Sequence, residues 1–285
     1  MKLNTPLTTE CAIRTLLLDH EVRERLVASY LTRSVREDAE AFATSGEFAE
    51  VVRLLGGSVH GKVVVDLGAG RGVASHAFVR AGAKIVHSVE PDPSDLVGYG
   101  ALKQLTTIDR INIVPSCGES LPLETGIADV VYIRQVLHHA HNLESLVAEC
   151  YRMLRPGGVF IATREHVVDN DEDLKEFLAN HPIHQLAGGE YAYSIDRYVR
   201  ALQEAGFAGI RVVKPWDSVI NAFPFVRTQE ELDLYLREKV RSRFGRLGDI
   251  AARLLLVRRL YVWRLNASRA PGRLCSFVGI KTKQE

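Results

Sequence analysis

Three glycines at alternate positions form the part of the sequence that is best suited to hold a ligand: Gly68, Gly70 and Gly72. A residue without Cβ lets the backbone turn sharply and lets a ligand approach within contact distance. The acid Asp66 stands just before this loop, where its carboxylate can meet a cationic group directly or through water. These residues predict a site for a small ligand that carries a positive charge.

The spacing of the glycines separates two kinds of nucleotide-binding loop. A dinucleotide fold needs the pattern G-x-G-x-x-G, which places a pyrophosphate on a helix N-terminus. Val73 stands where the third glycine of that pattern would be, so the spacing disfavours an NAD-dependent oxidoreductase. Glu90 ends the next apolar run and can accept hydrogen bonds from both hydroxyls of a ribose. That role is shared with NAD enzymes and does not separate the two classes.

Histidines and charged residues gather after two later apolar runs, residues 128–134 and 159–163. They are His138, His139, His141, Arg164, Glu165 and His166. A following segment adds His181, His184, Glu190, Tyr191 and Tyr193. Because histidine titrates near neutral pH, it is a suitable base for a sugar or phenol hydroxyl. We therefore predict that His139 or His166 is a catalytic base. We also predict that Arg164 and Glu165 orient the acceptor, which is the molecule that carries this hydroxyl.

Two alternatives stay open for these histidines. His139 can instead cap a helix and order its loop, without any part in a reaction. Three of the histidines, with Glu165 and Glu190, can also hold a divalent metal ion. However, adjacent histidines rarely point the same way, and the sequence has no H-x-x-x-H helix pair. We predict a site without a metal.

A parallel sheet would bring all of these groups to one edge. Short β-branched runs predict strands at residues 62–65, 84–89, 111–114, 128–134, 159–163 and 210–213. Helical spacing of apolar residues lies between them, at residues 73–81, 94–106, 143–154 and 195–205. Ligands of such α/β sheets bind beyond the carboxyl ends of the strands. The acceptor pocket should lie over the ends of the fourth and fifth strands.

Four segments resemble the class I, Rossmann-like S-adenosylmethionine (SAM) methyltransferases, and specifically the methyltransferase type 11 group. They are the loop 66–72, Leu121-Pro122-Leu123 with Asp129, Leu137-His138-His139, and Leu154-Arg155-Pro156-Gly157-Gly158. SAM carries an ammonium, a sulfonium and a carboxylate but no phosphate. The resemblance covers about residues 48–213 and the last strand. It implies an α/β fold with a seven-stranded, mostly parallel sheet, helices on both faces and an antiparallel last strand.

The resemblance also implies which residues bind the cofactor SAM: Asp66, Gly68, Ala69, Gly70, Glu90, Gly118, Glu119 and Arg134. Cys117 stands where the family has the acid that binds the adenine amino group, so Gly118 and Glu119 are the remaining candidates for that contact. The residues assigned to the acceptor are His138, Arg164, Glu165, His181, His184 and Tyr193. Val73 and the Leu-Pro-Leu and Leu-His-His segments disfavour the alternative class, an NAD-dependent oxidoreductase.

The composition is that of an ordinary soluble globular protein. Hydrophobic residues make up 46% and charged residues 25%, and the net charge of +1 argues against a whole-surface nucleic-acid binder. The four cysteines form no C-x-x-C pair and are expected to be reduced thiols. We find no signal peptide and no run of about 20 apolar residues that could cross a membrane. A cytoplasmic location is expected.

The chain is expected to have four parts. Residues 1–57 form a helical segment, with Asp19 and Ser34 as helix caps, and residues 58–214 form the SAM-binding core, with a substrate-side insertion at 166–193. Residues 215–270 form a helical insertion before the last strand in 271–285, expected at 274–281. Residues 227–285 hold 14 Lys/Arg against 6 Asp/Glu. The helices at 229–244 and 248–265 are expected to pack on the core or in a homodimer. The alternative is contact with anionic lipid or a lipid-linked acceptor.

We predict a SAM-dependent methyltransferase that O-methylates a small hydroxylated molecule or a sugar or glycan. The polar, histidine-rich acceptor site supports this choice. The alternatives are methylation of RNA or protein, and a non-catalytic subunit that keeps the SAM fold and binds a partner. The sequence has no strong nucleic-acid signal. The intact Asp66, Gly68, Gly70 and Glu90 argue against a subunit that has lost its cofactor site.

Overall fold

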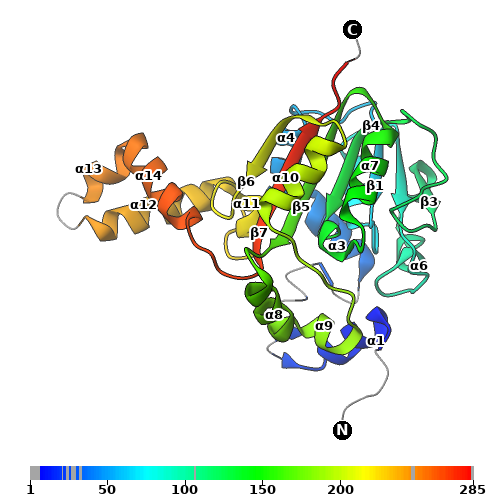
Figure 1. Ribbon diagram of the computed structural model, residues 1–285, viewed down its shortest axis with the longest axis horizontal. Coiled ribbons are helices and arrows are strands. Elements are labelled where there is room, and N and C mark those ends of the chain that lie inside the picture. The colour runs from blue at the N-terminus through cyan, green and yellow to red at the C-terminus, as the bar shows by residue number, and fades with distance from the viewer. Residues whose placement is uncertain are drawn as a thin grey trace.

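Seven strands form one continuous sheet in the part of the chain that the computed structural model describes, residues 7–20, 22, 23, 26, 30, 31, 34–105, 107–244 and 248–283 (Figure 1). The strands are β1 (Val63–Leu67), β2 (Ile85–Val89), β3 (Ile111–Val114), β4 (Ala128–Arg134), β5 (Leu154–Val167), β6 (Ala208–Val213) and β7 (Arg273–Ile280). Their order is β3-β2-β1-β4-β5-β7-β6. Strands β1 to β5 pair in parallel, and β7 is antiparallel to both β5 and β6. The predicted sheet is confirmed, with its last strand inserted beside β6.

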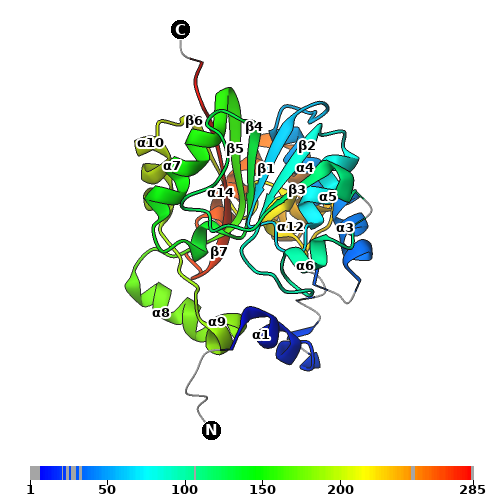
Figure 2. The same ribbon diagram turned by 90° about the vertical axis from the view of Figure 1, so that its right-hand side faces the viewer.

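Helices cover both faces of the sheet (Figure 2). On one face lie α3 (Val35–Ala43), α4 (Gly46–Leu54) and α5 (Val73–Arg80), and on the other lie α7 (Leu143–Met153) and α10 (Ile195–Glu204). The central strands are apolar at successive positions because both of their faces are buried. Each face therefore has its own apolar core, and the sheet is a rigid support for residues at its edges.

Three helices lie together beyond the carboxyl ends of the parallel strands (Figures 1 and 2). They are α1 (Thr9–Leu16), α8 (Asp171–Asn180) and α9 (Pro182–Ala187). The backbone N–H of Leu7 donates to the carbonyl of Leu186 at 2.9 Å, which joins the start of the described chain to the predicted substrate-side insertion. These helices cover the sheet edge at which α/β folds bind ligands.

A separate group of helices lies to one side of the sheet, beyond β6 (Figure 1). The group comprises α11 (Val219–Ala222), α12 (Gln229–Arg243), α13 (Gly248–Arg253) and α14 (Leu255–Asn266). A small apolar core under α12 holds it together. By contrast, α14 has no buried residue, although most of its residues are apolar. Among the described residues, no helix combines the length and the apolar character that a membrane span requires.

Three predicted elements differ from the observed ones. The helix expected at 94–106 is reduced to α6 (Tyr99–Leu102), because Gly98 packs directly on the carbonyl of Asp92 in an irregular turn. Strand β5 begins at Leu154 and so includes the expected turn, since its early part pairs with the end of β7. The helix expected at 248–265 is divided at Leu254, whose backbone is extended.

The helix caps follow the sequence where they are described. The Ser34 hydroxyl accepts from the N–H of Glu37 at 3.3 Å, as the capping-box pattern predicts. The Asp19 carboxylate accepts from the N–H of Val22 at 3.2 Å. Most of the helix expected after Asp19 lies outside the described residues.

Candidate active site

The glycine loop connects β1 to α5 and turns through three left-handed glycines. Gly68, Gly70 and Gly72 have φ angles of 70°, 53° and 79°, which residues with a Cβ rarely adopt. A Cβ on Gly68 would lie 2.3 Å from the Val136 side chain. The loop therefore also needs glycine there to pack against the segment that follows β4. The loop conformation therefore follows from the three glycines in the sequence.

Asp66 is buried at the end of β1, beneath this loop. Its carboxylate accepts from the Ser75 hydroxyl at 2.5 Å, and Ser75 also contacts the hydroxyl of Ser88 at 2.5 Å. Burial raises the pKa of Asp66 from 3.8 to about 7. The loop thus holds an acid that would gain from a cationic partner, which is the chemistry that the sequence predicts for this position.

Glu90 lies at the end of β2 and is held on both of its oxygens. One oxygen accepts from the N–H of Gly70 at 2.7 Å, and the other accepts from the N–H of Asp92 at 2.9 Å. Burial raises its pKa. Within the described residues, neither Asp66 nor Glu90 pairs with a lysine or arginine, and the two carboxylates together form an acidic pair beside the glycine loop.

A cavity of about 240 Å³ opens beside the loop. It is lined by Leu67, Gly68, Val89, Pro91, Ser116, Cys117, Gly118, Glu119, Val136, His139, Ala140 and Leu146. Three of the predicted cofactor residues line it, and the buried Ala69 lies in the adjoining turn, where its N–H donates to Val89. Its apolar walls and polar rim suit a heterocyclic ring. His139, a predicted catalytic base, lines the same cavity as the predicted cofactor residues.

Two arginines that the sequence assigns to the site have other partners. The Arg134 guanidinium donates to the buried carboxylate of Glu47 at 2.8 Å and lies near the rings of Tyr30 and Phe42. Arg164 has a φ of 60° and donates to the carbonyls of Ile220 and Phe223 at 2.8 and 2.7 Å. Burial lowers the pKa of Arg164 to about 10. Both guanidinium groups therefore tie the sheet to α4 and α11, and neither lines the cavity.

Glu47 is a residue that the sequence analysis missed. Its carboxylate is fully buried between Arg134 and Arg164, at 2.8 and 3.9 Å. The signal was an acid directly before Phe48, in the apolar stripe of α4. A buried carboxylate needs a charged or hydrogen-bonding partner, so this acid could have been matched to the arginines at the strand ends.

A histidine and glutamate cluster forms where β4 and β5 end. His138 lies in the short helix η2 (Leu137–His139), and its Nδ1 contacts the Glu165 carboxylate at 2.7 Å. Glu165 also accepts from the N–H groups of Val136 and His138, at 3.1 and 3.2 Å. Burial raises the pKa of Glu165 to about 6. Glu165 thus orders the loop and fixes the His138 ring.

Glu190 completes the cluster from the segment after α9. Its Oε2 lies 3.4 Å from Nε2 of His138 and 3.5 Å from Nδ1 of His139. That oxygen is buried and has no hydrogen-bond partner within the described structure. Burial, and then the nearby Glu165 charge, raise the pKa of Glu190 to about 8. From the sequence, Glu190 is placed near the acceptor site and given a role only in the metal alternative.

The remaining predicted acceptor residues lie around this cluster in different roles. His166 contacts the carbonyl of Gly272 through Nδ1 at 2.8 Å, and burial lowers its pKa to about 3. His181 caps α9, and burial lowers its pKa to about 4. The Tyr193 hydroxyl donates to the carbonyl of Ala140. His184 is half-buried in α9, and its Nδ1 has no hydrogen-bond partner among the described residues. His139 is the exposed member of the group and the one in the cavity wall.

The strand order, the antiparallel β7 and the glycine loop after β1 define the class I, Rossmann-like SAM-dependent methyltransferase fold. Residues 65–162 match the family described as methyltransferase domain. Residues 65–162 therefore form a methyltransferase domain, the kind of domain that the sequence predicts.

Relatives with this domain act on different molecules. The chain is 28% identical over 156 residues to the tRNA U34 carboxymethyltransferase of Pseudoalteromonas atlantica, across 55% of this chain and 47% of the relative. It is 30% identical over 155 residues to the ubiquinone biosynthesis O-methyltransferase of Cupriavidus pinatubonensis, across 52% of this chain and 58% of the relative. The chain thus spans about half the length of these curated relatives.

Solved structures share the fold at low sequence identity. The geranyl diphosphate C-methyltransferase of Streptomyces coelicolor A3(2) aligns with a TM-score of 0.55 and 14% identity, over 82% of this chain and 78% of that protein. The phosphoethanolamine N-methyltransferase 2 of Haemonchus contortus, in a complex with SAM, aligns with a TM-score of 0.52 and 20% identity, over 84% and 52%. These alignments agree with the strand order observed here.

Proposed function

We propose that the chain is a SAM-dependent methyltransferase that transfers a methyl group to a hydroxyl oxygen of a small molecule or sugar. One observation carries this proposal: His139 belongs both to the cavity beside the glycine loop and to the histidine and glutamate cluster. A cofactor in the cavity and an acceptor at the cluster would therefore be neighbours. Holding the two reactants in line supplies most of what methyl transfer requires.

The residues of the cavity and the loop fit SAM. Asp66 and the loop N–H groups would hold its charged methionine end, Glu90 would accept from the ribose hydroxyls, and Gly118 and Glu119 would hold the adenine. The supporting observation is that Asp66 and Glu90 are buried acids that form no ion pair within the described residues, since a cationic ligand offsets the burial of an acid. Bound SAM supplies an electrophilic methyl group. The protein then has to orient the acceptor and remove its proton.

The cluster supports removal of a proton from a hydroxyl group. The protein around its ring partly desolvates His139 and lowers its pKa, although nearly half of the side chain is exposed, so its imidazole is neutral near pH 7 and has a lone pair. His139 would accept the hydroxyl proton while the oxygen bonds to the methyl carbon and the bond from that carbon to the sulfonium sulfur breaks, which leaves S-adenosylhomocysteine. His166, the other predicted base, is already bonded to Gly272 and is a less accessible candidate. His138 and Glu165 would keep the loop in place.

The first test is incubation with SAM labelled in its methyl group and a host extract divided into small-molecule, glycan and lipid, RNA and protein fractions. Label in the small-molecule or glycan fraction supports the proposal. Label confined to RNA or protein would replace the proposed acceptor with a macromolecule. Cofactor binding without label in any fraction would favour a non-catalytic subunit.

A substitution tests whether His139 itself acts as the base. His139→Gln should lower kcat by about 100-fold or more, the usual contribution of a general base. Its effect on the Kd for SAM should be small. His141→Gln is the matched control, because His141 is an exposed histidine two residues along the chain. Unchanged turnover in His139→Gln would remove His139 from the mechanism.

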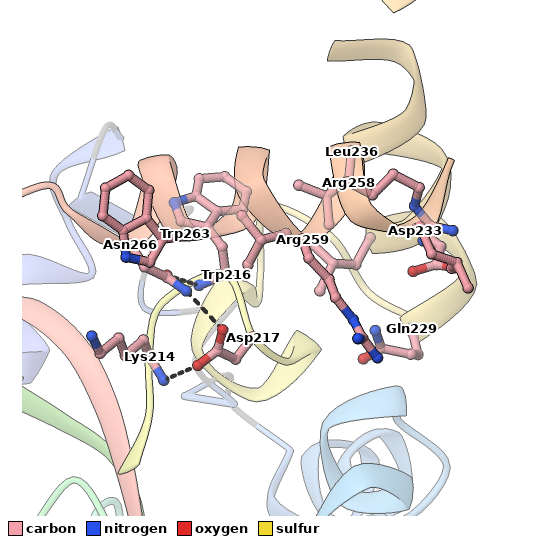
Figure 3. Close-up of a pocket in the computed structure, with 13 residues that line it drawn as sticks. Lys214, Trp216, Asp217, Gln229, Asp233, Leu236, Arg258, Arg259, Trp263 and Asn266 are labelled. Carbon is pink, nitrogen blue, oxygen red and sulfur yellow. Dashed lines mark hydrogen bonds and ion pairs between the residues drawn. The ribbon is translucent and has the colours of Figure 1, made fainter. Parts of the chain in front are cut away.

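We also propose that α14 brings the enzyme to an anionic membrane surface, where a lipid-linked acceptor could be presented. The apolar side chains of Leu256 and Trp263 are 70% and 71% exposed, and α14 also carries the exposed Arg259 and Arg264, whereas Arg258 is paired with Asp233. A groove of about 500 Å³ lies between α14 and α12, with Trp216 and Trp263 on its walls (Figure 3). Arginines beside exposed apolar residues suit anionic lipid, each contributing about 1 kcal/mol near such a surface.

Sedimentation with lipid vesicles tests this second proposal. The protein should pellet with vesicles that contain phosphatidylserine and stay in solution with phosphatidylcholine alone. The double substitution Leu256→Ser, Trp263→Ser should abolish pelleting without unfolding the chain, because both side chains are exposed. Absence of pelleting, together with a dimer that the same substitutions dissociate, would identify a second copy of the chain as the partner of this surface.

A further inference from the structure

Three potential ligand atoms meet at the edge of the proposed acceptor site. One ligand atom from each of His138, His139 and Glu190 lies within 4.8 Å of the other two. Oε2 of Glu190 faces Nε2 of His138 and Nδ1 of His139, and this Nδ1 also lies 3.4 Å from the carbonyl oxygen of Gly189, a contact that a metal ion would replace. His138 and Glu190 are buried, and His139 is exposed on the side of the cavity. The rings of the two adjacent histidines lie 4.4 Å apart with only a 34° tilt. The argument that adjacent histidines point apart therefore fails here.

The hydrogen bonds around His138 leave its Nε2 with a lone pair. Glu165 already accepts two backbone N–H groups, and its short contact with Nδ1 of His138 places the ring proton on Nδ1. Nε2 therefore faces Glu190 as an acceptor, 3.4 Å from a carboxylate oxygen that has no hydrogen-bond donor. At 3.4 Å the two atoms form no hydrogen bond, and once Glu190 is ionised neither of them has a proton to donate to the other.

We propose that His138, His139 and Glu190 bind a divalent transition-metal ion of the zinc type. Ligand atoms about 2.0–2.1 Å from a tetrahedral zinc ion are roughly 3.3 Å from each other. The two nitrogen-to-carboxylate distances, 3.4 and 3.5 Å, match that separation. An octahedral magnesium ion would bring neighbouring ligands to roughly 2.9 Å and prefers oxygen ligands. This proposal replaces the expectation of a site without a metal.

The surroundings of the three ligands are those of a metal site with an open position. A carboxylate that holds the second nitrogen of a metal-bound histidine fixes its orientation, and Glu165 does this for His138. His181 lies nearby, but its Nδ1 accepts from the N–H of His184, so it is not counted as a ligand. Two histidines and one glutamate leave a fourth position for water or substrate.

The fourth coordination position would have a role in catalysis only if the proposed function holds. His139 borders the cavity, so an acceptor oxygen at the fourth position would lie beside the cofactor. In that case the metal ion would lower the pKa of the acceptor hydroxyl, and Nδ1 of His139 would act as a ligand in place of a free base. Metal binding itself does not depend on methyl transfer and is tested separately.

The test uses the full chain, stripped with EDTA and titrated with Co²⁺, whose four-coordinate complexes absorb strongly in the visible range. We expect one equivalent to bind with such bands and Zn²⁺ to displace it. Glu190→Gln and His139→Gln should each lose the bands and weaken binding by more than 100-fold. Glu165→Gln should retain the bands and weaken binding by about 10- to 100-fold, the usual effect of removing an outer partner. His141→Gln should bind as the unaltered chain does.

Either of two results would overturn the metal site: no stoichiometric Co²⁺ binding, or equal affinity in Glu190→Gln and the unaltered chain. Circular dichroism checks that each variant is folded, and His139→Gln keeps the test valid if Glu190→Gln is not, because His139 is exposed. Metal binding without methyl transfer would refute the proposed function alone. Methyl transfer that survives EDTA, in a chain that does not bind Co²⁺, would refute the metal alone.

Discussion

Asp66 is the acid beneath the glycine loop whose ionisation the fold changes. Its carboxyl group is buried, and its pKa of about 7 in the fold lies far above its ordinary value of 3.8. Folding therefore favours the protonated acid. The stability that this provides is present below about pH 4 and is lost as the pH rises through 7.

Asp66→Asn should remove this pH dependence, because an amide does not titrate. The variant should gain stability relative to the unaltered chain as the pH rises from 4 to 7, by on the order of 3 kcal/mol. Urea unfolding of both chains across this range measures the difference. A difference that stays constant with pH would show that Asp66 is ionised in the folded state throughout.

Glu90→Gln should weaken SAM binding by about 2 kcal/mol, or roughly 30-fold. The amide can still accept one of the two backbone hydrogen bonds, but it loses the charge and one of the acceptors available to ribose hydroxyls. Isothermal titration with SAM measures the loss. Glu124→Gln, at an exposed glutamate outside the cavity, is the control and should bind SAM normally.

For individual residues, the sequence predicted the positions of the acids and glycines at the loop. It did not predict which groups the buried charged side chains contact. Asp66, Glu90 and the three glycines follow from spacing alone, because neighbours along the chain set their positions. Arg164 meets α11, more than fifty residues away in sequence. Such long-range partners depend on how the elements pack, which local patterns do not specify.

Helix α7 follows the histidine and glutamate cluster, so its start affects the geometry of the site. The Asn142 side chain caps it by accepting from the N–H of Ser145 at 2.9 Å. Asn142→Ala should lower the free energy of unfolding by about 1 kcal/mol, while Asn142→Asp should retain the cap. Urea unfolding measures both. Equal losses in the two variants would show that the amide group acts in some other way.

At the scale of elements, strands were easier to predict than the segments between them. β3 and β4 have the predicted bounds, since each contains a run of β-branched residues, at the edge of the sheet in β3 and buried in its centre in β4. The expected helix at 94–106 was wrong in length because glycines at 98 and 100 pack against the backbone of the preceding turn. Tertiary contacts of this kind override helical spacing.

For the whole molecule, SAM should stabilise the fold and NAD⁺ should not. A ligand at 100 times its Kd adds about 2.7 kcal/mol to the free energy of unfolding, which corresponds to roughly 5 °C or more in Tm for a chain of this size. Differential scanning fluorimetry with each ligand measures this. A shift with NAD⁺ alone would return the oxidoreductase, the class that Val73 disfavours, to consideration.

The arrangement of the cover over the active site was outside the reach of the sequence. Helices α1, α8 and α9 meet there from distant parts of the chain, joined by the hydrogen bond from Leu7 to Leu186. The proposed division into a helical segment, a core and a basic insertion stays a prediction, because its boundaries came from the expected elements and the family resemblance.

The place of β7 in the sheet has a consequence for the synthesis of the protein. Among the described strands, β6 pairs only with β7, and the whole of α11 to α14 separates the two along the chain. A ribosome that adds about 10 residues per second would need roughly 6 s to make the intervening 60 residues. During that time one edge of β5 and one edge of β6 lack β7, their final partner. Chaperones that bind unpaired strands would find their substrate in this interval, and a slower ribosome would lengthen it.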